Sequence, residues 1–270
     1  MRPCVFCGST AGRATDEHVI PKWARDGFDI QEWVTIDAAD PGAALEQVGR
    51  LRHLNIVFRD GLCAQCNNEW LGPIEKQAKA ILLPMALGAK PTALDAASQA
   101  LLAFWAFKTV FLLEFAFRQK YHNRSVAGYQ ATEPEMAWLR AKAQPPPNSM
   151  VWLGCWDCEQ KVPVRYEPSA ASVPAATGDA VSAHVATFTL GFVAFQVFSL
   201  DLVAAEARGA DVWSWTWEPP EALRAALPRI WPPQLAVPDV SWPPPCFRRD
   251  DWRRLVTWDE ARRPPGHDSP

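Results

Sequence analysis

The chain has 270 residues, of which 49% are hydrophobic and 21% are charged, and its formal net charge is -3. This length suffices for one large or two modest domains, and the weak negative charge argues against a protein that holds nucleic acid by bulk electrostatics. The weak negative charge does not exclude an enzyme that binds phosphate through bound cations, because such cations change the local charge. Residues 1–30 lack a charged start followed by an apolar run, so we expect no signal peptide.

Two Cys-x-x-Cys pairs lie near the start of the chain, Cys4 with Cys7 and Cys63 with Cys66. A gap of two residues lets both sulfurs of a pair reach one metal, and two such pairs are typical of a tetrahedral four-thiolate zinc site. Four thiolates close the coordination shell, so we expect a structural zinc that replaces a hydrophobic core. This pairing indicates metal ligands in a reducing compartment, the cytoplasm, and not a disulfide framework.

An acidic residue followed by a histidine lies between the two pairs. Asp16, Glu17 and His18 belong to a segment, 15–20, that we expect to be extended and to end at Pro21. A neutral imidazole at His18 can take a proton from water, and the Glu17 carboxylate suits Mg²⁺ or Mn²⁺. Asp16 is an alternative ligand. Neighbours on an extended segment point opposite ways, so Asp16 and Glu17 are not expected to share one ion.

The second pair continues directly into Asn67-Asn68. We expect a strand over 51–60 before this pair and a helix over 63–71 after it, ended by Gly72-Pro73. The order Cys-x-x-Cys, Glu-His-x-x-Pro, Cys-x-x-Cys-Asn-Asn resembles the zinc-containing HNH endonucleases, in particular a bacterial HNH-like group. Their ββα-metal fold, similar to a treble clef, is clamped by two cysteine knuckles. The resemblance covers residues 4 to about 75.

The resemblance implies a metal-dependent endonuclease that hydrolyses phosphodiester bonds of nucleic acid, with DNA the expected substrate and no membrane partner. It implies that His18 is the general base and that Glu17 and Asn67 hold the catalytic Mg²⁺ or Mn²⁺. Asn67 can instead cap its helix, and Asn68 can take either role. In this family a middle Asn orients the base. Asn55 is the nearest candidate, a few residues too far before Cys63, and His53 competes for that role.

Helices are expected over 74–87 and 94–120. The stretch 100–117 is almost wholly apolar and long enough to span a membrane, but Lys108 and Glu114 lie near its middle. We therefore expect a buried helix of a soluble protein, with these two charges paired or at the helix edge.

After Pro145-Pro146-Pro147 the composition favours strands and loops. We expect a hairpin of 150–156 with 162–167, a loop over 168–180, and one long bent strand or two strands over 181–200. A last helix is expected over 249–263. Trp213, Trp215 and Trp217 share a strand face and are expected to pack in the core, although such a stripe can also stack bases.

Two further groups carry weaker signals. Cys155 and Cys158 form a lone pair that Cys246 and His184 could complete, but a plain hairpin is the simpler interpretation. Arginine doublets near the C-terminus could touch phosphate, although the acidic residues between them favour a solvated helix face. These doublets are Arg248-Arg249 and Arg253-Arg254, and they flank Asp250-Asp251.

The expected fold class is α+β. It consists of an HNH-like unit over 1–75 and an α+β domain over 76–270, with helices in 76–143, strands in 150–217 and a Trp- and Pro-rich tail over 218–270. The first functional interpretation is a metal-dependent nuclease. A further one makes the later domain a sensor or partner-binding part that gates the nuclease, as in a defence effector or toxin. The alternative is a catalytically inactive, zinc-stapled module that binds nucleic acid or protein.

Overall fold

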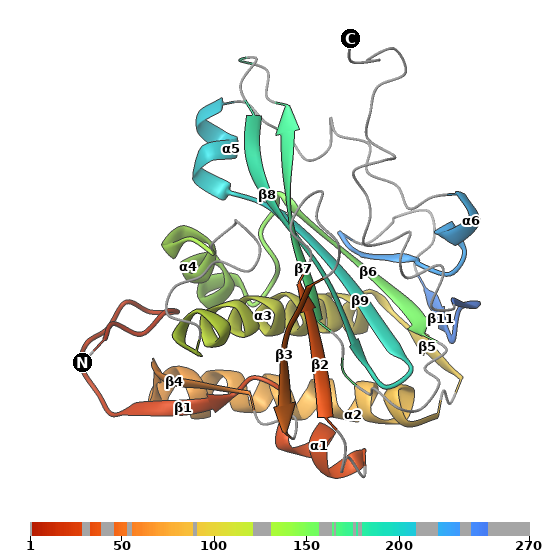
Figure 1. The fold of residues 1–270 in the computed structure, drawn as a ribbon, viewed down its shortest axis with the longest axis horizontal. Coiled ribbons are helices and arrows are strands. Elements are labelled where there is room, and N and C mark those ends of the chain that lie inside the picture. The colour runs from red at the N-terminus through yellow and green to blue at the C-terminus, as the bar shows by residue number, and fades with distance from the viewer. Residues whose placement is uncertain are drawn as a thin grey trace.

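The structure is a computed structural model of the α+β class, in which one long helix lies beneath an antiparallel sheet (Figure 1). The chain is described over residues 2–28, 33–38, 46–52, 56–88, 91–120, 131–156, 164, 166–174, 177, 180–208, 221–232 and 239–247.

The N-terminal unit is built from two antiparallel strands followed by a helix. Strand β1 (Ala14–His18) pairs with β4 (Val57–Cys63), as the extended segments of the sequence predict. The chain then enters a π-helical segment, η1 (Gln65–Leu71), which runs directly into α2 (Gly72–Gly88). The boundary expected at Gly72-Pro73 is confirmed, since η1 ends at Leu71 and α2 begins at Gly72 with Pro73 in its first turn, although the two helices follow one another without a loop.

A β-bulge distorts β4 opposite Asp16. The register shifts between Thr15 and Glu17, and Asp60 lies in the left-handed region with φ of 53°. Gly61 follows, and a Cβ there would meet the Phe58 ring at 2.0 Å, so only glycine fits. Bulges of this kind re-aim side chains next to functional sites.

The segment between β1 and β4 contains α1 (Lys22–Gly27) and a second strand pair, β2 (Trp33–Ala38) with β3 (Glu46–Arg52). The single strand expected over 51–60 is therefore divided between the end of β3 and the start of β4. The pair β2–β3 stands in front of α3 and the larger sheet in Figure 1.

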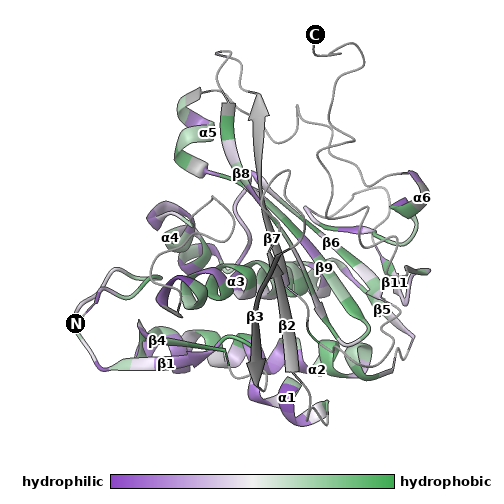
Figure 2. Ribbon diagram, in the orientation of Figure 1, coloured by the Kyte–Doolittle hydropathy of each residue, from purple (hydrophilic) through white to green (hydrophobic). Residues whose placement is uncertain are grey.

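Helix α3 (Ala96–Lys120) is the centre of the core. Much of the helix is green, hydrophobic, in Figure 2, and its residues 102–114 are all buried. By length and hydropathy the segment Ala96–Gln119 could cross a bilayer, but 83% of an apolar 18-residue stretch within it is buried inside the protein. This burial is typical of a core helix in a soluble protein, and it confirms the central buried helix that the sequence predicts.

The main sheet has six strands, in the order β10–β6–β9–β8–β7 with β12 beside β6. Strands β8 and β9 form a hairpin whose turn includes Gly191, at φ of 57°, and this confirms the two-strand alternative. The expected pairing of 150–156 with 162–167 is wrong, because β6 pairs with β9 whereas β7 pairs with β8. The bounds are β6 Ser149–Trp156, β7 Tyr166–Pro174, β8 Ala180–Leu190, β9 Val193–Leu200, β10 Arg229–Trp231 and β12 Cys246–Phe247.

Strand β7 occupies most of the segment expected to be a loop, 168–180. Its Ala-, Ser- and Pro-rich residues pair in register with β8, so tertiary context overrides their low strand propensity. One sheet face packs on α3, and the other packs against short helices. The remaining elements are β5 (Thr92–Leu94), α4 (Glu133–Lys142), α5 (Leu202–Arg208), α6 (Glu221–Arg224) and β11 (Val240–Trp242).

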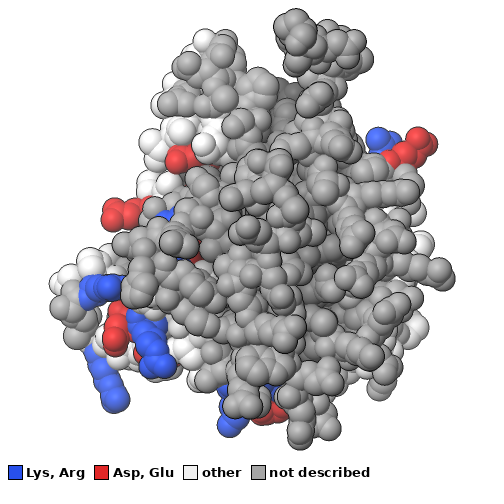
Figure 3. Space-filling model, in the orientation of Figure 1, with Lys and Arg blue, Asp and Glu red and all other residues white. Residues whose placement is uncertain are grey.

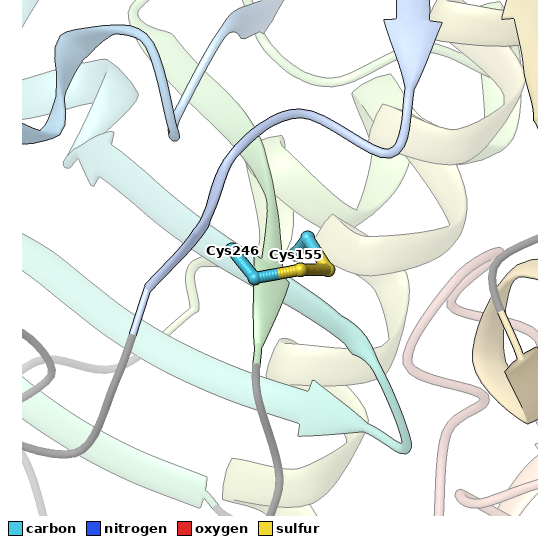
Figure 4. Close-up of a disulfide and its surroundings, with 2 residues drawn as sticks. All are labelled: Cys155 and Cys246. Atoms are coloured by element: carbon cyan, nitrogen blue, oxygen red, sulfur yellow. A yellow bond between two sulfur atoms is a disulfide. The ribbon is translucent and has the colours of Figure 1, made fainter.

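A disulfide joins Cys155 of β6 to Cys246 of β12 (Figure 4). The two strands run parallel with these residues as direct partners, so the bond ties the C-terminal segment to the sheet. The lone-pair expectation for Cys155 is corrected: its partner is Cys246, and His184 instead contacts Glu114. Cys158, the tryptophan stripe Trp213, Trp215 and Trp217, the arginine doublets and the expected helix over 249–263 lie outside the described residues.

Candidate metal centre and active site

The four cysteines of the two Cys-x-x-Cys pairs meet at one point. Their sulfur atoms all lie within 4.8 Å of one another, and Cys7 Sγ is 3.8 Å from Cys63 Sγ. A tetrahedral zinc with Zn–S bonds of about 2.3 Å requires sulfurs separated by about 3.8 Å. The cluster can therefore hold a metal ion such as zinc, with Cys4, Cys7, Cys63 and Cys66 as its ligands.

The electrostatics of the four thiols suit a cation. Burial raises the pKa of the Cys66 thiol well above its usual value, and the neighbouring cysteines raise it further. For Cys4, burial acts in the same direction, but backbone hydrogen bonds from Cys63, Cys7 and Phe6 outweigh it and lower the pKa to about 7. A thiolate at one cysteine thus opposes ionisation of its neighbours, and a bound cation relieves that opposition.

Aromatic packing attaches this cluster to the core. Phe6, inside the first knuckle, makes an edge contact with Trp70 of η1, and Trp70 makes another with Phe104 of α3. Arg140 of α4 lies over the same Trp70 ring, at 4.8 Å from its centroid. One continuous hydrophobic cluster contains the cysteine unit and the larger sheet.

Glu17 and His18 occupy opposite sides of β1. Glu17 is 9% exposed and faces the helices, whereas His18, at the end of the strand, is exposed. The alternation of a strand predicts this division. The structure therefore places the candidate carboxylate ligand inside and the candidate base at the surface, with one residue step between them.

Asn67 lies on the same side of β1 as Glu17. Its Nδ2 donates to Thr15 Oγ1 at 3.0 Å and to the Asp16 carbonyl at 3.3 Å. A further hydrogen bond from Asn67 acts to lower the pKa of Glu17. No side-chain capping bond is made at the start of η1, so Asn67 fastens η1 to β1 and is not its N-cap. Asn68, its neighbour, is exposed.

The Glu17 carboxylate belongs to a buried charge cluster that includes Glu75 of α2 and Lys108 of α3. Lys108 Nζ lies 3.9 Å from Glu17 Oε1 and makes a direct ion pair with Glu75 Oε1. Burial raises the pKa of Glu17 to about 7, although Lys108 acts in the opposite direction, and Glu75 raises it further. Glu17 is thus poised between its neutral and ionised forms, as two carboxylates that share one ammonium require.

On the exposed side of β1, Asp16 is held by the bulge. Its Oδ2 lies 3.4 Å from Arg59 Nη1, and the Asp60 N–H donates to its Oδ1. Gln119 of α3 fixes the Arg59 backbone from both directions, since it accepts from the N–H and donates to the carbonyl. Asp16 therefore faces away from Glu17 and Asn67. This placement excludes the alternative in which Asp16 replaces Glu17 and binds the cation together with Asn67.

The remaining expected residues differ in their outcome. Asn55 and His53, the candidates for orienting the base, lie outside the described residues. The expectation that Lys108 and Glu114 are paired or at the helix edge is resolved differently for each. Lys108 pairs with Glu75 and Glu17, and Glu114 pairs with Arg118 and His184. Sequence reasoning missed Glu75 at the site; its only signal was an acidic residue about two helical turns beyond Asn67-Asn68.

Charged side chains of both signs are mixed at the end of the molecule that carries β1 and β4 (Figure 3). Comparisons of the chain with models of known protein families, with curated proteins and with solved structures find no match.

Proposed function

We propose that the protein is a metal-dependent endonuclease of the HNH type, with DNA as its substrate. The observation that carries the proposal is the convergence of Glu17 and Asn67 on one side of β1, next to a four-cysteine cluster. The strand-strand-helix order of β1, β4 and η1 supports it, because this is the arrangement that the motif resemblance implies.

Two metals have separate places in this proposal. Zinc at the four cysteines is structural, because four thiolates leave no position for substrate. Carboxylate and amide oxygens of Glu17 and Asn67 suit Mg²⁺ or Mn²⁺, which when bound supplies a Lewis acid for the phosphodiester. The Glu17 carboxylate and the Asn67 amide are the groups that would hold such an ion, and Asn67 would have to turn its amide so that the oxygen replaces the nitrogen that donates to Thr15.

The residues of the chain divide the remaining work. His18, exposed at the end of β1, takes the proton of the attacking water as general base. Glu17 and Asn67, on the inner side of β1, would hold the cation that binds the reacting phosphate. The zinc cluster keeps η1, and with it Asn67, against β1. Asn55 remains the proposed orienting residue for His18.

The buried ion pair supports a second candidate, a zinc-stapled binding module without catalysis. Lys108 already compensates part of the negative charge on Glu17 and Glu75, and burial raises the pKa of Glu17 to about 7. A protein that kept the fold and lost its cation would be expected to fill the site in this way. The expected cytoplasmic location also stays a prediction, and the Cys155–Cys246 disulfide weighs against it.

The test is cutting of supercoiled plasmid by the zinc-loaded full chain with Mg²⁺, with Mn²⁺ or with neither. We expect nicks only with an added cation, and slower nicking by the Glu17→Ala variant. Glu69→Ala is the matched control, because Glu69 is an exposed carboxylate on η1. The binding module would be supported instead if the wild-type protein binds DNA but neither binds Mg²⁺ or Mn²⁺ nor cuts DNA in their presence.

A further inference from the structure

A fully buried lysine from α3 reaches the Glu17 carboxylate. The Lys108 side chain is 0% exposed, and its Nζ lies 3.9 Å from Glu17 Oε1. Glu75 of α2 pairs with the same ammonium, and Trp105 Nε1 donates to the same Glu75 oxygen at 3.0 Å. Neither Glu75 nor Lys108 belongs to the cysteine pairs or to the Glu-His segment. Both nevertheless lie at the carboxylate that the proposed function assigns to the cation.

Stability alone gives a weak reason for a charge in this position. Lys108 is surrounded on its helix by buried apolar residues such as Phe104, Phe107 and Phe111. Removing an ammonium from water is costly, and apolar replacements of a buried ion pair are often neutral or stabilising. The ammonium instead serves to orient its neighbour. Trp105 and Glu75 fix the position of Lys108 Nζ, and Lys108 Nζ in turn restricts where the Glu17 oxygens can lie.

We propose that Lys108 and Glu75 are positioning residues of the Glu17–Asn67 site. Strand alternation places Glu17 on the side of β1 that faces Asn67, and Lys108, held by Glu75, orients the Glu17 carboxylate there to accept a divalent cation. The inference rests on the proposed function and deepens it, since α2 and α3 then complete the site. Residues beyond 75 are thus part of the cation centre and not an appendage to it.

The chain offers a variant that removes this positioning without changing the charge of the site. Two carboxylates and one ammonium leave a single net negative charge when all are ionised. In the double variant Lys108→Met with Glu75→Gln, Glu17 alone supplies the same net charge. Long-range attraction of a cation is therefore matched between the two proteins, and the difference between them reports the lost contacts.

The experiment is titration of the zinc-loaded full chain with Mn²⁺, followed by electron paramagnetic resonance of the free ion. We expect the wild type to bind Mn²⁺, Glu17→Gln to lose that binding, and the double variant to bind about 10-fold to 100-fold more weakly. The control is Glu114→Gln, which removes a buried carboxylate of α3 that pairs with Arg118 and not with Glu17. Its Mn²⁺ affinity should equal that of the wild type.

The outcomes separate the two proposals. Equal Mn²⁺ affinity in the wild type and the double variant overturns the positioning role, and so does a wild type that binds no Mn²⁺ or binds it without Glu17. If the wild type binds Mn²⁺ through Glu17 yet cuts no plasmid, the nuclease proposal fails while the positioning role stands. Should the double variant not fold with zinc, Lys108→Gln with Glu75→Gln replaces it, because this pair keeps the same net charge and polar side chains at both positions. An unchanged Mn²⁺ affinity in that protein again overturns the proposal.

Discussion

Replacing Lys108 by methionine should destabilise the protein strongly, because it leaves two buried carboxylates without their counter-charge. At 3.9 Å, the attraction between Lys108 and Glu17 is worth about 4 kcal/mol for an effective dielectric constant of about 20. This agrees with the loss of about 3 to 5 kcal/mol that follows removal of one partner of a buried pair. We therefore expect the free energy of unfolding to fall by about 4 kcal/mol near neutral pH.

The assay is urea unfolding of zinc-loaded wild type and Lys108→Met, followed by tryptophan fluorescence. The double variant with Glu75→Gln should recover part of the loss, since it removes one of the two uncompensated charges. The loss should also shrink as the pH is lowered, because protonation neutralises the remaining carboxylates. A loss below about 1 kcal/mol, the value of an exposed pair, would show that Lys108 is not the buried counter-charge that the structure describes.

Three further predictions concern the same unit. Cys63→Ser, or removal of zinc by a chelator, should unfold the N-terminal unit, because metal binding and folding are one event in such units; retained far-ultraviolet circular dichroism and protease resistance would contradict this. The pKa of Glu17 is raised from 4.5 to about 7, so the unfolded chain gives up this proton at a lower pH than the folded protein. Without Mg²⁺ or Mn²⁺, the free energy of unfolding of the wild type should therefore fall by up to about 3 kcal/mol relative to Glu17→Gln as the pH rises between these values. The comparison is made by urea unfolding at each pH, and a difference that does not change with pH would refute it. Asn67→Ala should cost about 1 kcal/mol through its lost bonds to β1, whereas Asn68→Ala, an exposed neighbour, should be neutral in the same assay, and equal effects would count against the clamp.

The cysteine cluster and the opposite placement of Glu17 and His18 could be predicted because both depend on the spacing of residues that are close together in the sequence. A two-residue gap between cysteines fixes how two sulfurs can be presented, and alternation along β1 determines that Glu17 and His18 face opposite ways. The apolar stretch of α3 identified the core helix in the same local manner.

The rest depends on contacts between distant segments. No local sequence pattern indicates that Lys108 pairs with Glu17 and Glu75, and none pairs Cys155 with Cys246. Strand β7 was expected to be a loop because its composition is poor in strand formers, yet β8 provides a complete hydrogen-bonding partner. The wrong hairpin has the same cause, since strand order is set by packing on α3 and not by proximity along the chain.

The proposed role of His18 as the base of a cation-dependent nuclease is tested by the rate of plasmid nicking by His18→Ala under saturating Mn²⁺. We expect a rate about 100-fold or more below wild type, with zinc content unchanged and with partial recovery when imidazole is added. Lys22→Ala, an exposed change just beyond β1, should cut at the wild-type rate. Undiminished cutting by His18→Ala would contradict this role, because the activity would then belong to another group.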